Sequence, residues 1–219
     1  MPAKRFVWAA LALWFATVFA LGALGAFVRP DGTAPLPIAL GATLPIAAFL
    51  IAYRMSRAFR ALVLSADLRF LAGVQAWRLG GFWFLALYTY ELLPGLFAWP
   101  AALGDMAVAF VAPWVIVKLS TDKAFAGSRR FVAWNLLGIL DLVVAVSMGA
   151  LSSGVIPGLV PVTTAVMAQI PLVLIPAFFV PLFITLHLAS LFQARRATLG
   201  GRARFERSGA VPALRGSGQ

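Results

Sequence analysis

Seven side chains that are ionisable or carry an amide lie within apolar stretches of this 219-residue chain. An ionisable group inside a bilayer costs several kcal/mol unless it is paired or hydrated, so such residues are the first candidates for chemistry. We consider them candidates for ligand binding or proton coupling: Gln75, Arg78, Glu91, Asp105, Asn135, Asp141 and His187.

Asp141 has the most demanding environment of the seven, because it is flanked by the run ILDLVVAV and is too short to reach a membrane surface. Two states are consistent with that position. In one, Asp141 pairs with Arg78, the only basic residue placed within the membrane, and the pair locks two helices together. In the other, Asp141 keeps its proton, which is what a proton-coupling carboxyl needs.

Arg78 is expected about 10 Å from the inner membrane edge, at 1.5 Å of rise per residue. At that depth it can either pair within the bundle or extend its stem to the headgroups. Gln75 lies one helical turn away on the same face, and Asn135 and His187 are at similar depth. We therefore expect these four residues to form one polar layer toward the cytoplasm, with His187 as an interhelical hydrogen-bonding residue or a ligand contact.

Glu91 and Asp105 are expected near the outer side of the membrane. Glu91 lies beside Pro94 at a helix end, which is typical of a solvated boundary charge. Asp105 follows Gly104 about five residues into its predicted helix, where water from outside would reach it.

The composition excludes several kinds of site. The chain has no cysteine and one histidine, which excludes disulfides, thiolate metal sites, cysteine nucleophiles, bis-His haem and three-His zinc. We expect no metal site, and no cofactor is indicated. The net charge of +11 is spread over loop ends, so it predicts contact with anionic lipid headgroups and not with nucleic acid.

The hydropathy pattern predicts an all-α polytopic transmembrane bundle, since about 20 apolar residues are needed to cross the hydrocarbon core. Six runs qualify, namely residues 6–28, 36–53, 71–92, 101–119, 131–150 and 170–191. Residues 1–192 form a single transmembrane domain in this interpretation. Residues 193–219 form an Arg- and Gly-rich cytoplasmic tail that we expect to be disordered.

The basic residues set the orientation. All but two of the 18 Lys and Arg residues fall at the N-terminus, in 54–69, in 118–130 or in the tail. This positive-inside pattern places both termini in the cytoplasm. Residues 151–169 carry Gly154, Pro157, Gly158 and Pro161, so they are expected to form an outer loop or re-entrant segment, with a seventh span as the alternative.

Two further segments have alternative interpretations. Residues 6–28 are expected to be a retained helix, because the run exceeds the usual core of a signal peptide, which is the alternative. Residues 55–69 hold too much charge to cross, so we expect a cytoplasmic connector, with an interfacial helix that turns Phe59, Leu62 and Leu68 toward lipid.

Three motifs carry a family resemblance over about residues 70–150: QAWRLGG at 75–81, Leu93-Pro94 through Gly104-Asp105, and WNLLGILDL at 134–142. On these residues the chain resembles a family of uncharacterised bacterial integral membrane proteins. The resemblance implies a polytopic membrane protein and carries no activity with it.

Three functions follow from these observations. The first is a small-solute or proton-coupled transporter in the bacterial inner membrane, with Asp141 as titrating group and Arg78 as its counter-charge. A chain of this length is small for a transporter, which makes a homo-oligomer an option. The alternatives are a membrane enzyme that acts on a lipid-like substrate through Asp105, Asp141 and His187, and a structural or accessory subunit.

Overall fold

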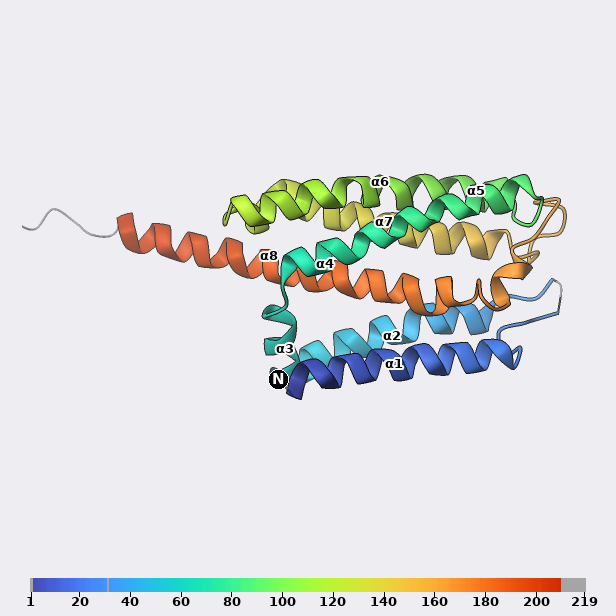
Figure 1. Ribbon diagram of the computed structural model, residues 1–219, viewed down its shortest axis with the longest axis horizontal. Helices are drawn as coiled ribbons and strands as arrows, with labels where there is room; N and C mark the ends of the chain where they lie inside the picture. The colour runs from blue at the N-terminus through green and yellow to red at the C-terminus, as the bar shows by residue number, and fades with distance from the viewer. Residues whose placement is uncertain (1, 31, 210–219) are drawn as a thin grey trace, which may run out of the picture.

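The structure, a computed structural model, describes residues 2–30 and 32–209, including the side chains of 5–30 and 32–199. It is all-α, and among the described residues six helical stretches are long and apolar enough to cross a membrane. They run roughly alongside one another along the long axis of the molecule (Figure 1). The predicted six-span bundle is confirmed, with candidate spans at Arg5–Ala23, Leu36–Met55, Leu68–Thr89, Gly95–Thr121, Arg129–Leu151 and Ile175–Leu199.

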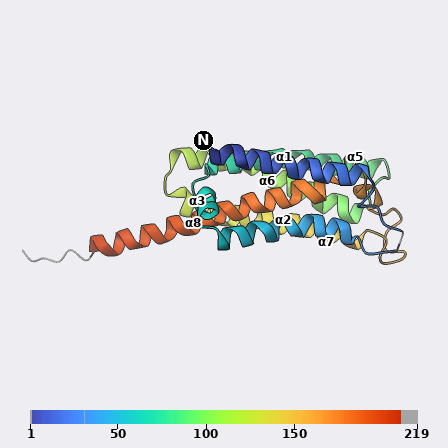
Figure 2. The same ribbon diagram turned by 90° about the horizontal axis from the view of Figure 1, so that it is seen from below.

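The last helix, α8 (Val180–Gly209), is the central element of the bundle. It packs against α2 (Leu36–Met55) on one side and against α4 (Leu68–Gln75) and α7 (Arg129–Leu151) on the other. Figure 2 shows α8 between α1 (Pro2–Ala23) and α2 in the turned view. The helix α8 therefore lies between the pair α1 and α2 and the group that includes α4 and α7.

The third span is interrupted at its centre. The helix α4 passes into a 3-10 helical segment at Ala76–Gly81 and then into α5 (Phe82–Thr89). The 3-10 geometry rises about 2.0 Å per residue where an α-helix rises 1.5 Å, and such a stretch inside a helix often marks a functional site. Arg78 lies in this segment.

The fourth span, α6 (Gly95–Thr121), begins six residues earlier than the sequence suggested. Pro94 forms its N-cap, whereas Pro100 lies inside the second helical turn and does not end the helix. Asp105 is therefore ten residues, or about 15 Å, from the helix start, which is near the middle of a bilayer.

Polar caps begin three helices at one end of the bundle. The Ser56, Asp67 and Ser128 side chains accept hydrogen bonds from backbone N–H groups at distances of 3.2, 2.9 and 3.2 Å. These residues start α3 (Arg57–Leu64), α4 and α7. The basic loops lie at this same end, which we call the basic end (Figure 1).

Residues 151–169 do not form a seventh span. They consist of turns and one short 3-10 helix, Ala165–Ala168, at the end of the bundle opposite the basic end (Figure 1). Gly154 and Gly158 have φ of 92° and 76°, in the left-handed region that favours glycine. A hydrogen bond of 2.8 Å from the Thr164 hydroxyl to the Gly149 carbonyl holds the segment against α7.

The connector after α2 differs from the expected lipid-facing helix. In α3, Phe59 makes an edge contact with Phe49 of α2, with ring centroids 5.6 Å apart, and Leu68 packs in the same cluster as Phe59. The Gln193 side chain of α8 donates to the Val63 carbonyl at 3.0 Å. The apolar face of the connector is therefore directed toward the bundle.

The tail also differs from the sequence expectation, since α8 continues as a helix to Gly209. Residues 210–219 of the predicted disordered tail lie outside the described residues.

Candidate functional site

Arg78 lies at the centre of a buried polar cluster that joins the third, fourth, fifth and sixth spans. Its side chain is fully buried, with 0% exposure. Its Nε donates to Asp105 Oδ1 at 2.7 Å, and its Nη2 donates to Asp141 Oδ2. Its Nη1 donates to the Gly138 carbonyl at 3.3 Å and contacts His187 Nε2 at 3.3 Å. Because every guanidinium nitrogen has a partner, Arg78 is paired within the bundle and does not extend to the headgroups.

His187 and Asn135 extend this cluster toward the basic end. His187 Nδ1 lies 2.9 Å from Asn135 Oδ1, and Asn135 Nδ2 donates to the Phe131 carbonyl at 2.9 Å. An arginine only donates hydrogen bonds, so His187 Nε2 must accept and Nδ1 must carry the proton. The contacts therefore assign a neutral imidazole that relays hydrogen bonds from Arg78 to Asn135.

Three glycines create the space for these polar side chains. A Cβ at Gly81 would lie 2.5 Å from the Asp105 Cβ. A Cβ at Gly104 would collide with the Asp141 carboxylate, and one at Gly138 would lie 2.5 Å from His187 Cε1. Each glycine thus lies on one helix against a polar residue of the next, so the cluster requires glycine at these positions.

The cluster holds one arginine and two carboxyl groups. The Asp105 and Asp141 side chains are 16% and 13% exposed, whereas Arg78 is 0% exposed. Asp105 Oδ2 has no hydrogen-bond partner among the described residues. If both carboxyls are ionised the cluster carries one excess negative charge, and a single bound proton neutralises it.

A cavity of about 320 Å³ leads to this cluster from the end opposite the basic end. Asp105 lines its inner end, and the exposed Arg29 lines its outer end. Its walls are mostly apolar and come from α2, α7, the 164–169 segment and the π-helical turn Ile175–Phe179 that precedes α8. Along α7 the lining residues run from Leu142 to Ala150, which corresponds to a length of about 12 Å.

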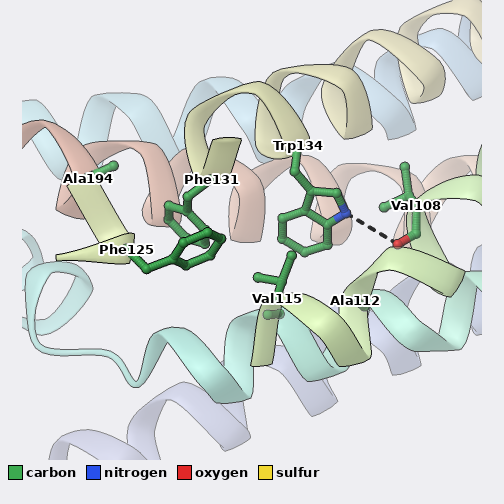
Figure 3. Packing of buried hydrophobic residues seen from close by; sticks show 8 residues of the cluster. Val108, Ala112, Val115, Phe125, Phe131, Trp134 and Ala194 are labelled. Carbon is green, nitrogen blue, oxygen red and sulfur yellow. Dashed lines mark hydrogen bonds between the residues drawn. The ribbon is translucent and has the colours of Figure 1, made fainter. Parts of the chain in front are cut away.

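Packed aromatic side chains lie between the polar cluster and the basic end. Phe125, Phe131 and Trp134 are buried with Val115 and Ala194, with Phe125 and Phe131 ring centroids 5.8 Å apart (Figure 3). The Trp134 indole N–H donates to the Val108 carbonyl at 3.3 Å, and its ring lies edge-on to His187 at 5.4 Å. A cavity thus reaches the polar cluster from the end opposite the basic end, and packed aromatic rings separate the cluster from the basic end.

The predicted site residues divide into three groups in the structure. Five of them are joined by direct hydrogen bonds, namely Arg78, Asp105, Asp141, Asn135 and His187. Gln75 is buried nearby, but its Nε2 donates to the Phe183 carbonyl at 3.3 Å and its Oε1 has no partner in the described part of the chain. Glu91 is exposed at the turn after α5 and does not join the cluster.

The expected separation of Asp105 from Arg78 is wrong, since the two residues form an ion pair. The error arises from the helix starts, because α6 begins earlier and the 3-10 segment places Arg78 deeper than the sequence estimate. The sequence reasoning also missed Gly138 and Trp134 as parts of the site. The detectable signal was a glycine close in sequence to the polar residues of the third, fourth and fifth spans: Gly81, Gly104 and Gly138.

No group of three His, Cys, Asp or Glu side chains among the described residues is placed to hold a metal ion.

Comparisons with known proteins identify a family without a known activity. No curated protein and no solved structure matches the chain. Residues 35–195, which include α2 and all members of the polar cluster, match a domain of unknown function, DUF8737. The protein therefore belongs to the DUF8737 family, as a multi-pass membrane protein with a buried Arg78–His187 polar cluster.

Proposed function

We propose that the protein is a proton-coupled carrier of a small solute in the bacterial cytoplasmic membrane, with its basic end in the cytoplasm. The observation that supports this function best is the cavity of about 320 Å³ whose inner end is the Asp105 carboxyl. A volume of about 300–1,000 Å³ is usual for small-molecule sites. The orientation follows from the positive-inside rule.

Asp105 is the proposed coupling group, in place of the Asp141 assigned from the sequence. Arg78 faces two carboxyls, so one of them can exchange a proton while the other stays paired with the guanidinium. Asp105 lines the cavity and its Oδ2 is without a protein partner, whereas Arg78 is fully buried behind it. A proton and a solute would therefore meet at Asp105.

The arrangement of access and closure supports alternating access. The cavity leads to Asp105 from the end opposite the basic end. The rings of Phe125, Phe131 and Trp134 close the path from the basic end. Transport would require these rings to separate as the cavity closes. The helices α1 and α2 pack on α8 and its π-helical turn, so movement of this pair would change the cavity wall.

The proposal is tested in proteoliposomes that contain a pH-sensitive dye. Small anions, neutral solutes and alkylammonium ions are added in turn, and internal pH is followed. We expect one class to drive a proton flux in the wild type and in the Glu91→Gln control, and not in Asp105→Asn. An unchanged flux in Asp105→Asn would remove Asp105 from the mechanism, and no flux with any class would contradict transport.

A structural role is the second candidate, because the buried Arg78 contacts three other spans through Asp105, through Gly138 and Asp141, and through His187. This role predicts that Asp105→Asn weakens the fold without affecting any flux. An enzyme acting through His187 has less support, since both ring nitrogens are already occupied and the side chain is fully buried.

A further inference from the structure

We propose that the ligand of the cavity is an alkylammonium-type amphiphile, with an unbranched apolar body along the cavity and its cationic group on Asp105 Oδ2. This inference rests on the proposed carrier function and names the chemical class of its substrate. It comes from the shape of the cavity, the chemistry of its walls and the free oxygen at its inner end.

The shape of the cavity favours a narrow, extended molecule. It extends about 12 Å along α7 with a volume of about 320 Å³. Its walls are predominantly apolar over this length, with contributions from Ile38, Phe84, Leu142 and Val146. A chain of methylene groups buried against such walls gains about 0.8 kcal/mol per CH₂ when it leaves water.

The charged groups at the inner end of the cavity favour a cationic ligand. Asp105 lines the cavity, and its Oδ1 accepts from Arg78 Nε, which leaves Oδ2 as the oxygen without a partner among the described residues. The other charged or titratable groups around Asp105 are Arg78, Asp141 and His187, and His187 is neutral in the assigned hydrogen-bond pattern. Two ionised carboxylates and one guanidinium carry a net charge of −1, and a cationic N–H donor at Oδ2 neutralises it.

Binding of this ligand would release a proton. In the empty site one proton neutralises the excess carboxyl, and when the ammonium group arrives this proton leaves Asp105 for water in the cavity. The ammonium then donates to the ionised Oδ2, so the charge of the cluster is balanced before and after binding. Arg29 at the outer end is exposed to solvent, where its charge is screened from the inner end.

The test compares three ligands with the same chain and different charge: octylammonium, octanol and octanoate. Each is titrated calorimetrically into nanodisc-embedded protein, with empty nanodiscs of the same lipids as the blank. A charge-assisted hydrogen bond makes octylammonium at least about tenfold tighter than octanol. Octylammonium should also release up to about one proton per protein into a weakly buffered suspension.

Asp105→Asn should remove this preference and the proton release, while Glu91→Gln should retain both. Because Asp105→Asn could fail to fold, the comparison of the three ligands on the wild type decides the sign of the charge independently. Equal affinities, tighter octanoate or no binding above the blank would each overturn the inference. Octylammonium binding without proton flux in liposomes would contradict the carrier function alone, whereas flux with another solute and no octylammonium binding would contradict the ligand class alone.

Discussion

The cluster holds one arginine and two carboxyls, so we expect substitution of the arginine to lower the free energy of unfolding more than substitution of either carboxyl. Arg78→Gln leaves Asp105 and Asp141 facing each other without a cation, in a site where Arg78 was 0% exposed. At the 2.7 Å separation of Arg78 Nε and Asp105 Oδ1, the attraction lost is about 6 kcal/mol for an effective dielectric constant of about 20. The desolvation of the arginine is recovered, so we expect a net loss of about 3–5 kcal/mol in the free energy of unfolding.

The carboxyl substitutions should cost less. Asp105→Asn leaves Arg78 paired with Asp141, and Asp141→Asn leaves it paired with Asp105. Each therefore replaces the excess carboxyl, whose charge a proton neutralises in the empty site, and removes one hydrogen bond, so we expect a loss of about 1 kcal/mol. Asp105→Asn should also recover part of the stability lost in Arg78→Gln, since it reduces the repulsion between the carboxyls.

These differences can be measured by equilibrium unfolding in mixtures of dodecyl sulfate and maltoside micelles, followed by tryptophan fluorescence. Glu91→Gln is the control, because it removes a carboxylate from an exposed position outside the cluster. A loss in Asp105→Asn or Asp141→Asn as large as that in Arg78→Gln would refute the assignment of an excess carboxyl.

The other predictions concern the close helix contacts and the basic end. Gly138→Ala places a methyl group against His187 and should destabilise the fold by about 1–3 kcal/mol in the same unfolding assay, whereas Gly80→Ala, with no atom within 4 Å of its added Cβ, should have little effect. Gln193→Ala removes two hydrogen bonds to the connector, and limited proteolysis should then cut residues 56–67 faster. Hydrogen bonds from the Arg69 side chain and backbone hold the pKa of Asp67 below its model-compound value of 3.8. The stability this gives to the start of α4 is present above pH 3.8 and is lost as pH falls through the lowered value, so amide exchange there should accelerate in acid. Asp67→Asn should weaken this acid dependence.

The sequence predicted the architecture well because hydropathy and charge act locally. Long apolar runs are sufficient to identify spans, and the basic residues cluster at one end of the bundle as expected (Figure 1). The prolines and glycines of segment 151–169 favoured an outer loop or re-entrant segment over a seventh span, and the structure has turns there. The extension of α8 to Gly209 was missed, because polar composition alone did not distinguish a projecting helix from a disordered tail.

The site was only partly predictable. The pairing of Arg78 with Asp141 was one of two states that the sequence left open, because Arg78 was the only basic residue expected within the membrane. The depth of Asp105 did not, because it depends on whether Pro100 ends a helix or lies within one. The roles of Gly104 and Gly138 depend on which side chain lies on the neighbouring helix, and that information is tertiary.

Accessibility of the cavity to a water-soluble reagent decides whether a solute can reach Asp105. Because the chain has no native cysteine, an introduced thiol is the only one that can be labelled. Ala145→Cys places one thiol in the cavity wall, and Leu140→Cys places a control thiol on an exposed apolar surface of the same helix. Both variants are treated with a membrane-impermeant thiol reagent in right-side-out and inside-out vesicles, and labelling is followed by mass spectrometry. We expect Ala145→Cys to be labelled only from the end opposite the basic end, and octylammonium to slow this labelling. Leu140→Cys should not be labelled from either end. Labelling of Ala145→Cys from the basic end alone, or from neither end, would contradict a solute pathway to Asp105.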